Sequence, residues 1–171
     1  VEMRTMTLWR ALALLPLALA ASCGRESRPA GGPPNVVFFV GDGFGSGAWA
    51  VGRALGIAQG QHLVLDDAPY LGFLDTRSQD ALVTDSAAAA TEWATGRRGK
   101  NRVIGATPAA PLPNLFERQA KAGRGAGFIT TTRVTHATPA PFYARVRDRG
   151  DEQAIAAQVV GALPTVAIGG G

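Results

Sequence analysis

The sequence has little of several features that define common classes of protein. Cys23 is the only cysteine, so no disulfide can form within the chain. The net charge is only +4, and the basic residues are scattered apart from a short cluster at residues 97–100. Nucleic-acid-binding proteins usually carry a dense basic stripe with aromatic side chains. We therefore expect no nucleic-acid partner, and interpret the cluster as a solvated loop or a weak attraction for anionic substrates.

The apolar run near the N-terminus, residues 11–21, is too short for a membrane-spanning helix but has the length of a signal-peptide core. The segment Leu19-Ala20-Ala21-Ser22-Cys23 then resembles a bacterial lipoprotein cleavage box, in which the cysteine becomes the lipidated first residue. Ala20 departs from the Leu or Val that is usual there. We predict a signal peptide with a lipoprotein-type box over residues 1–23, and hence a periplasmic or outer-membrane-anchored lipoprotein. The alternative is an ordinary secretory signal.

Residues 24–34 are rich in Gly, Pro and Arg and predict a flexible linker, so residues 35–171 remain for one domain. Residues 35–40 form an apolar run rich in β-branched and aromatic side chains, which predicts a strand buried on both faces. Further strands are expected over residues 125–131 and from 165 to 168. Helices are expected from about residue 48 and over residues 87–95, 114–122 and 151–160. This alternation predicts an α/β fold with a parallel sheet.

Sites in such sheets lie beyond the carboxyl ends of the strands. Asp42, between two glycines, follows the first predicted strand, and its carboxylate suits a divalent cation. His136 and Thr138 alternate in a loop after a later strand, so an extended loop would let both serve one ion. Taken singly, Asp42 is as well explained by a turn and His136 by a surface or capping role.

Ser86 stands at the predicted start of a helix, where the backbone dipole favours an oxyanion or a phosphate. A serine hydroxyl is a weak nucleophile until a base or a metal activates it. No Gly-x-Ser-x-Gly elbow surrounds Ser86 and the chain has two histidines, so a Ser-His-Asp triad is poorly supported. The structural alternative makes Asp85 or Ser86 a helix cap and the following alanines a packing face. Arg149 could bind two phosphate oxygens or be a solvated surface residue.

A competing motif starts at Gly43. The pattern Gly43-x-Gly45-x-x-Ala48 matches the looser dinucleotide-binding fingerprint, with Asp66 and Asp67 about twenty residues further on. Such a short glycine pattern is weak evidence, and nothing else in the sequence supports a nucleotide site.

Three segments, taken together and in order, resemble the alkaline phosphatase family. Asn-Val-Val-Phe-Phe-Val-Gly-Asp-Gly at residues 35–43 is similar to its first strand and metal-ligand loop. Val-Thr-Asp-Ser-Ala-Ala-Ala-Ala-Thr at residues 83–91 is similar to its nucleophile segment. Thr-His-Ala-Thr-Pro-Ala at residues 135–140 is similar to its magnesium-site loop. The resemblance implies a partial doubly wound parallel sheet with helices on both faces.

The resemblance also implies a zinc- and magnesium-dependent phosphate monoester hydrolase. Ser86 would be the nucleophile, contact zinc and form a phosphoserine, and Asp42 would bridge zinc and magnesium. His136 and Thr138 would belong to the magnesium site, although some members carry Asp where this chain has His136. Arg149 would be the arginine that binds the phosphate, and Asp85 would orient that arginine.

The family takes most of its zinc ligands, and a magnesium-site glutamate, from later segments than those matched here. We therefore expect residues 35–171 to be the N-terminal part of an alkaline phosphatase domain, whose full-length form would be a homodimer. One alternative is a catalytically inactive fragment. The other is a different reaction of the same superfamily, such as that of a diesterase, sulfatase or phosphomutase.

Overall fold

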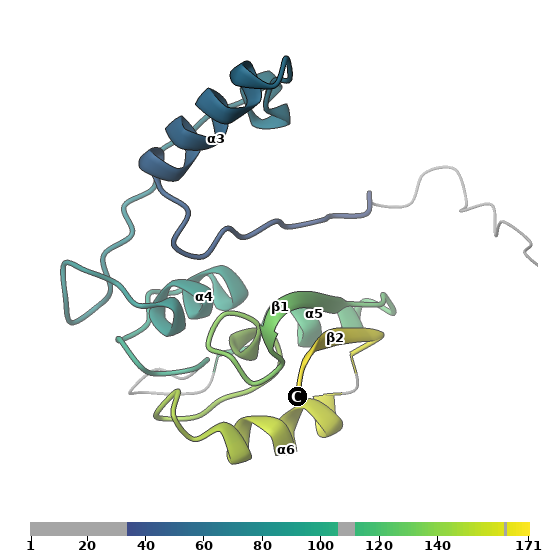
Figure 1. Cartoon of the computed structure of the whole chain (residues 1–171). Coiled ribbons are helices and arrows are strands. Elements are labelled where there is room, and N and C mark those ends of the chain that lie inside the picture. Colours follow the sequence, from purple (N-terminus) through teal and green to yellow (C-terminus); the bar gives the residue numbers. More distant parts are fainter. Residues whose placement is uncertain (1–33, 106–111, 163) are drawn as a thin grey trace, which may run out of the picture. The chain divides into compact units, whose positions relative to one another are not determined.

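The computed structural model describes residues 34–105, 112–162 and 164–171. It divides the chain into two units, residues 1–40 and residues 41–171. Of the first unit only residues 34–40 are described, so the predicted signal peptide, Cys23 and nearly all of the linker lie outside the described residues. The second unit contains every helix and strand of the described part (Figure 1). In chain order these are α3 (Ser46–Ala58), η1 (Val64–Asp67), α4 (Ser86–Thr95), α5 (Leu115–Lys121), β1 (Gly127–Arg133), η2 (Ala140–Phe142), α6 (Glu152–Ala162) and β2 (Val166–Gly170).

The predicted strand over residues 35–40 is wrong. The segment has no regular structure, and its apolar side chains are exposed, with Val36 at 82% and Phe39 at 88%. A strand is held by hydrogen bonds to a neighbouring strand, and no strand of the described residues pairs with this segment. High β-propensity without a partner is therefore not enough to form the strand.

β1 and β2 pair in parallel, with Phe128 opposite Ala167 and Ile129 opposite Ile168 (Figure 1). The connection between them contains η2 and α6, which makes a β-α-β unit. Gly127 is required at the first pair, because an added Cβ would lie 2.8 Å from the backbone nitrogen of Val166. The α/β class with a parallel sheet is confirmed, although the described residues contain only two strands.

Two of the helices begin and end where local chemistry dictates. Asp85 caps α4, and Gly96 ends it in the left-handed conformation with φ 73°. Asn114 caps α5 through a capping box, in which its side chain accepts from the Glu117 amide while the Glu117 side chain accepts from the Asn114 amide. These predicted helices are thus confirmed to within a residue or two.

The core lies between α4, the η2 turn and α6. It is built largely from alanines, including Ala87 of α4 and Ala140 of η2, with Ile104 and Ile155 as the larger members. Small side chains let α4 approach the η2 turn closely, so the N-terminal end of α4 comes near the loop that follows β1 (Figure 1). The aromatic rings of Phe116, Phe128 and Tyr143 stack over the inner side of β1.

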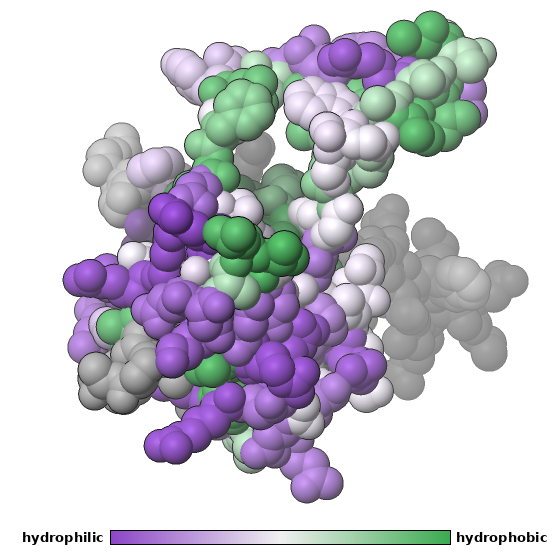
Figure 2. All heavy atoms as spheres, turned by 90° about the vertical axis from the view of Figure 1, so that its left-hand side faces the viewer, coloured by the Kyte–Doolittle hydropathy of each residue, from purple (hydrophilic) through white to green (hydrophobic). Residues whose placement is uncertain are grey.

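α3 and η1 form a separate hairpin whose polar contacts converge on Asp66. The Asp66 carboxylate accepts from the indole of Trp49 at 3.0 Å and from the guanidinium of Arg53 at 2.7 and 3.0 Å. Apolar side chains remain exposed on both elements, including Val51, Leu55 and Val64. Figure 2 shows hydrophobic (green) surface on this hairpin. No helix in the described part of the chain is long and apolar enough to cross a membrane.

Candidate functional site

Ser86 is the first residue of α4, directly after the N-cap. The Asp85 carboxylate accepts the amide of Ala88 at 2.9 Å, which satisfies one of the donors left free at the start of the helix. Ala87, Ala88 and Ala90 are buried against the core. The capping and packing roles are therefore confirmed, and they leave the half-buried Ser86 hydroxyl at the positive end of the helix dipole.

Asp42 brings Ser86 and Thr138 together. Its Oδ2 accepts a hydrogen bond from the Ser86 hydroxyl at 3.0 Å and another from the Thr138 hydroxyl at 2.9 Å. The carboxylate is placed by a tight turn in which the Phe44 amide donates to the Gly41 carbonyl and Gly43 has φ 70°. Three segments far apart in the sequence thus meet at one carboxylate oxygen.

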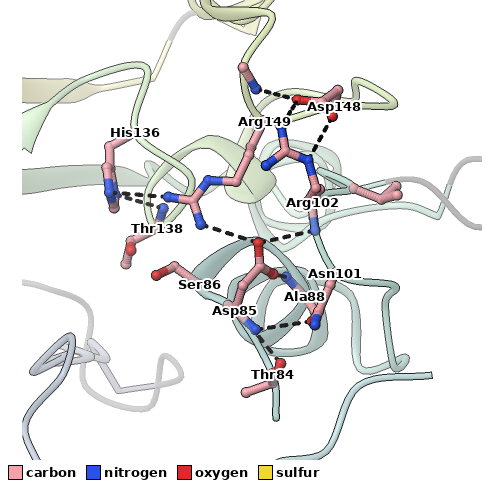
Figure 3. Close-up of polar contacts among 12 residues, drawn as sticks. Thr84, Asp85, Ser86, Ala88, Asn101, Arg102, His136, Thr138, Asp148 and Arg149 are labelled. Carbon is pink, nitrogen blue, oxygen red and sulfur yellow. Dashed lines mark hydrogen bonds and ion pairs between the residues drawn. The ribbon is translucent and has the colours of Figure 1, made fainter. Parts of the chain in front are cut away.

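Arg149 lies at the same end of α4, beside Asp85 (Figure 3). Its Nη1 donates to Asp85 Oδ2 at 3.2 Å, and both side chains are about one quarter exposed, at 27% and 25%. The expectation that Asp85 orients Arg149 agrees with this contact. A guanidinium held beside a helix N-terminus favours an anion with several oxygens, such as a phosphate.

His136 lies beside Thr138 and Arg149 and contacts both (Figure 3). The Thr138 amide donates to His136 Nδ1 at 3.2 Å, and His136 Nε2 is 3.5 Å from Arg149 Nη2. Partial burial, followed by the charge of Arg149, lowers the pKa of His136, so the ring is neutral at physiological pH. A neutral imidazole has one acceptor nitrogen, so only one of these contacts is a hydrogen bond at a time, and the shorter contact to the Thr138 amide favours Nδ1 as the acceptor.

The donor atoms around Asp42 suit a hard cation better than zinc. One carboxylate and two hydroxyls converge there, and oxygen ligands of this kind are those that magnesium prefers. A catalytic zinc site usually needs three protein ligands. No group of three or more His, Cys, Asp or Glu side chains within the described ranges could hold a metal ion. Asp42 and Ser86 therefore supply part of a zinc site at most, and further ligands would be needed.

Three residues around the site, Asn101, Arg102 and Asp148, are missing from the predicted set. Asn101 accepts the Asp85 amide at 3.0 Å and donates to the Val83 carbonyl at 2.9 Å. Arg102 donates its backbone amide to Asp85 at 3.0 Å and its guanidinium to Asp148. These residues lie in loops with no sequence spacing typical of a site, so only the fold reveals them.

The dinucleotide pattern lacks its structural context. The glycines at positions 43 and 45 precede α3, but residues 34–42, which lead into them, form no strand, and the fingerprint requires a strand on that side. Asp66 is engaged by Arg53 and Trp49. His62, which no motif includes, is exposed and pairs with Asp67 at 2.6 Å.

The chain is similar to known phosphatases over most of its length. Residues 34–164 match the family model of alkaline phosphatase. The streptomycin-6-phosphate phosphatase of Streptomyces griseus is 34% identical, over 98% of this chain and 43% of its own length.

Solved structures match as well. The crystal structure of Thermus thermophilus alkaline phosphatase is 35% identical with a TM-score of 0.66, over 71% of this chain and 27% of that one. A variant of the TAB5 alkaline phosphatase with Mg bound in the M3 site is 32% identical with a TM-score of 0.55, over 56% of this chain and 28% of that one. The chain thus spans less than half the length of these relatives. Since the family model covers most of its residues, the chain belongs to the alkaline phosphatase family.

Proposed function

We propose that this chain carries the nucleophile and the phosphate-binding arginine of a metal-dependent phosphate monoester hydrolase. The observation that carries the proposal is the meeting of the Ser86 hydroxyl, the Asp42 carboxylate and the Arg149 guanidinium at the N-terminal end of α4. The family membership of the chain supports the same reaction class. Since the chain spans 43% of the length of its Streptomyces relative, the activity is proposed for the protein that contains it.

Each side chain has a separate task in this proposal. Arg149 binds two non-bridging oxygens of the phosphate, and the dipole of α4 stabilises the remaining negative charge. Ser86 Oγ gives up its proton to solvent and attacks the phosphorus, the ester P–O bond breaks, and the alcohol leaves as an alkoxide that takes up a proton from water. Asp42 Oδ2, at 3.0 Å, orients the serine hydroxyl for attack. Water then hydrolyses the phosphoserine and regenerates Ser86.

The proposed cofactors are divalent metal ions. A bound metal ion would lower the pKa of the serine hydroxyl and stabilise the leaving alkoxide as a Lewis acid. Asp42 and Thr138 would hold magnesium, with His136 beside them, and Asp42 and Ser86 would contribute to zinc. Calorimetric titration should show weaker Mg²⁺ binding for Thr138→Val. The matched control is Thr132→Val in β1, whose hydroxyl bonds Thr130 instead.

A chimera tests the nucleophile independently of how much of the protein this chain represents. Residues 35–171 replace the matching segment of Thermus thermophilus alkaline phosphatase. Labelled phosphate trapped at low pH should mark Ser86, and Ser86→Ala should abolish both the label and the turnover, while Ser86→Thr retains part of it. Ser46→Ala is the matched control, because Ser46 is also the first residue of a helix. Label on another residue would refute the assignment of Ser86.

The substrate panel separates the reactions of the superfamily. It contains p-nitrophenyl phosphate, bis(p-nitrophenyl) phosphate and p-nitrophenyl sulfate. Streptomycin 6-phosphate is added because the Streptomyces griseus relative is named for it. Monoesters should be hydrolysed fastest, and a preference for the diester or the sulfate would refute the proposed substrate class.

We also propose export with a lipid anchor on Cys23, supported by the apolar run of residues 11–21 and the small residues before the cysteine. Mass spectrometry of the mature N-terminus should find a diacylated Cys23. An unmodified N-terminus at Ser22, or at any residue beyond Cys23, would refute this proposal.

A further inference from the structure

Arg102 has a backbone conformation that its residue type rarely adopts. Its φ is 71°, and within residues 34–105, 112–162 and 164–171 it is alone among the non-glycine residues in having a positive φ. In this region the Cβ of an ordinary residue crowds the neighbouring carbonyl, so glycine is the usual occupant. Such strain persists only where surrounding contacts hold it, and it is common near functional sites.

Both backbone groups of Arg102 reach the phosphate-binding side of the candidate site. Its amide donates to Asp85 Oδ2 at 3.0 Å, the oxygen that also accepts from Arg149. Its carbonyl accepts the Arg149 amide at 2.7 Å. The left-handed turn therefore ties Arg102 to the carboxylate that orients Arg149 and to the backbone of Arg149 itself (Figure 3).

The side chain of Arg102 holds the residue next to Arg149. Its guanidinium makes a two-pronged contact with the Asp148 carboxylate, with Nε at 2.9 Å and Nη2 at 2.8 Å. Asp148 Oδ1 also accepts the Gly150 amide at 2.7 Å. All three residues of the segment 148–150 are thus held in place. The Asp148 carboxylate binds the Arg102 guanidinium and the Gly150 amide, and the Arg102 carbonyl accepts the Arg149 amide.

These contacts contribute little to the stability of the fold. The Arg102–Asp148 pair is exposed, at 63% and 49%, and exposed ion pairs are weak. The left-handed backbone works against stability, because a glycine would adopt it without strain. A glycine at position 102 would preserve both backbone contacts. The arginine side chain adds only the two hydrogen bonds from its guanidinium to the Asp148 carboxylate. The effect of these two hydrogen bonds falls on the position of Arg149.

We propose that Arg102 is a positioning residue that holds the guanidinium of Arg149 in place for a phosphate group. The inference rests on the proposed function, in which Arg149 binds the phosphate oxygens. Arg102 itself acts through Asp148 and through the Asp85 carboxylate. Its contacts therefore predict an effect on phosphate affinity that is larger than any effect on folding.

The test measures phosphate binding rather than turnover. The ¹⁵N-labelled full chain is titrated with inorganic phosphate, and the side-chain Nε–H signal of Arg149 is followed by NMR, after assignment by its loss in Arg149→Lys. Arg102→Gly should weaken phosphate binding about tenfold, because Asp148 and the adjacent Arg149 would no longer be held in position before the phosphate binds. Its thermal midpoint should stay close to that of the unmodified chain, because relief of strain offsets the lost pair.

Two further variants separate position from charge. Arg147→Gly removes the same charge from an exposed position in the loop that carries Arg149 and should leave phosphate affinity unchanged. Arg102→Lys keeps the charge but loses the planar fork, so it should bind phosphate nearly as weakly as Arg102→Gly. It also serves as the test if Arg102→Gly fails to fold.

Three outcomes would overturn the proposal: unchanged affinity in Arg102→Gly and Arg102→Lys, equal losses in these variants and in Arg147→Gly, or no response of Arg149 to phosphate in the unmodified chain. A failure of the proposed function gives a different result. In that case the chimera would hydrolyse phosphate monoesters without needing Ser86, while the phosphate titration would still report on Arg102.

Discussion

Asp85 has two roles that substitution can separate. One carboxylate oxygen caps α4 by accepting the Ala88 amide at 2.9 Å. The other accepts the Arg102 amide at 3.0 Å and Arg149 Nη1 at 3.2 Å. Asp85→Ala removes all three contacts. Asp85→Ser keeps a good N-cap, but a serine has one side-chain oxygen and cannot also reach the two arginines. It should therefore keep the contact to the Ala88 amide and lose those to Arg102 and Arg149.

The magnitudes follow from the contacts. Losing an N-cap costs about 1 kcal/mol. The contact with Arg149 is worth no more than about 1 kcal/mol, because both partners are partly exposed and water replaces the lost contact. We therefore expect Asp85→Ala to lower the free energy of unfolding by about 2 kcal/mol and Asp85→Ser by about half of that. Phosphate affinity should fall about tenfold in both variants, the equivalent of ~1.4 kcal/mol, because each releases Arg149.

Urea denaturation of the two variants measures the stabilities, and the phosphate titration measures the affinities. For a chain of this size the alanine variant should melt about 4–8 °C lower than the unmodified chain. Equal stabilities of Asp85→Ala and Asp85→Ser would refute the capping role. A serine variant that binds phosphate as well as the unmodified chain would refute the orienting role of Asp85.

Three further predictions concern the frame around the site. Thr91→Val should lower the free energy of unfolding by about 1–3 kcal/mol, because it leaves the buried Gly105 amide without its acceptor at 2.9 Å, whereas Thr91→Ser keeps that acceptor and should cost less in a urea titration. Arg133 lowers the pKa of Glu152 from 4.5 to about 2, so Glu152 contributes stability that is present above pH 4.5 and is lost as the pH falls toward 2. Glu152→Gln should flatten the dependence of the urea midpoint on pH in that window, and an unchanged slope would contradict the pairing. Gly127→Ala should expose β1 to rapid hydrogen exchange, because the added methyl group collides with the backbone of β2, and unchanged protection would contradict the close approach.

Among the elements predicted correctly, α4 and α5 have ends that neighbouring residues determine. Asp85, Gly96 and Asn114 act within one helical turn, so caps and breakers can be recognised without knowledge of the fold. The segment over residues 35–40 is the opposite case. Its composition favours a strand, but a strand forms only against a partner, and that partner is a property of the tertiary structure.

The sequence alone determined the family and the candidate residues Ser86, Asp42 and Arg149, because the order of the three segments is specific even where each motif is ambiguous. It could not determine how their side chains meet. Only the tertiary structure shows that Asp42 binds both Ser86, 44 positions further on, and Thr138, 96 positions further on, and that Asp85 holds Arg149. It alone reveals Arg102, because a left-handed backbone and a fork to Asp148 leave no periodic pattern in the sequence. Neighbouring residues determine local features such as helix caps. Contacts between residues about 40 to 100 positions apart form only when the chain has folded around a common core.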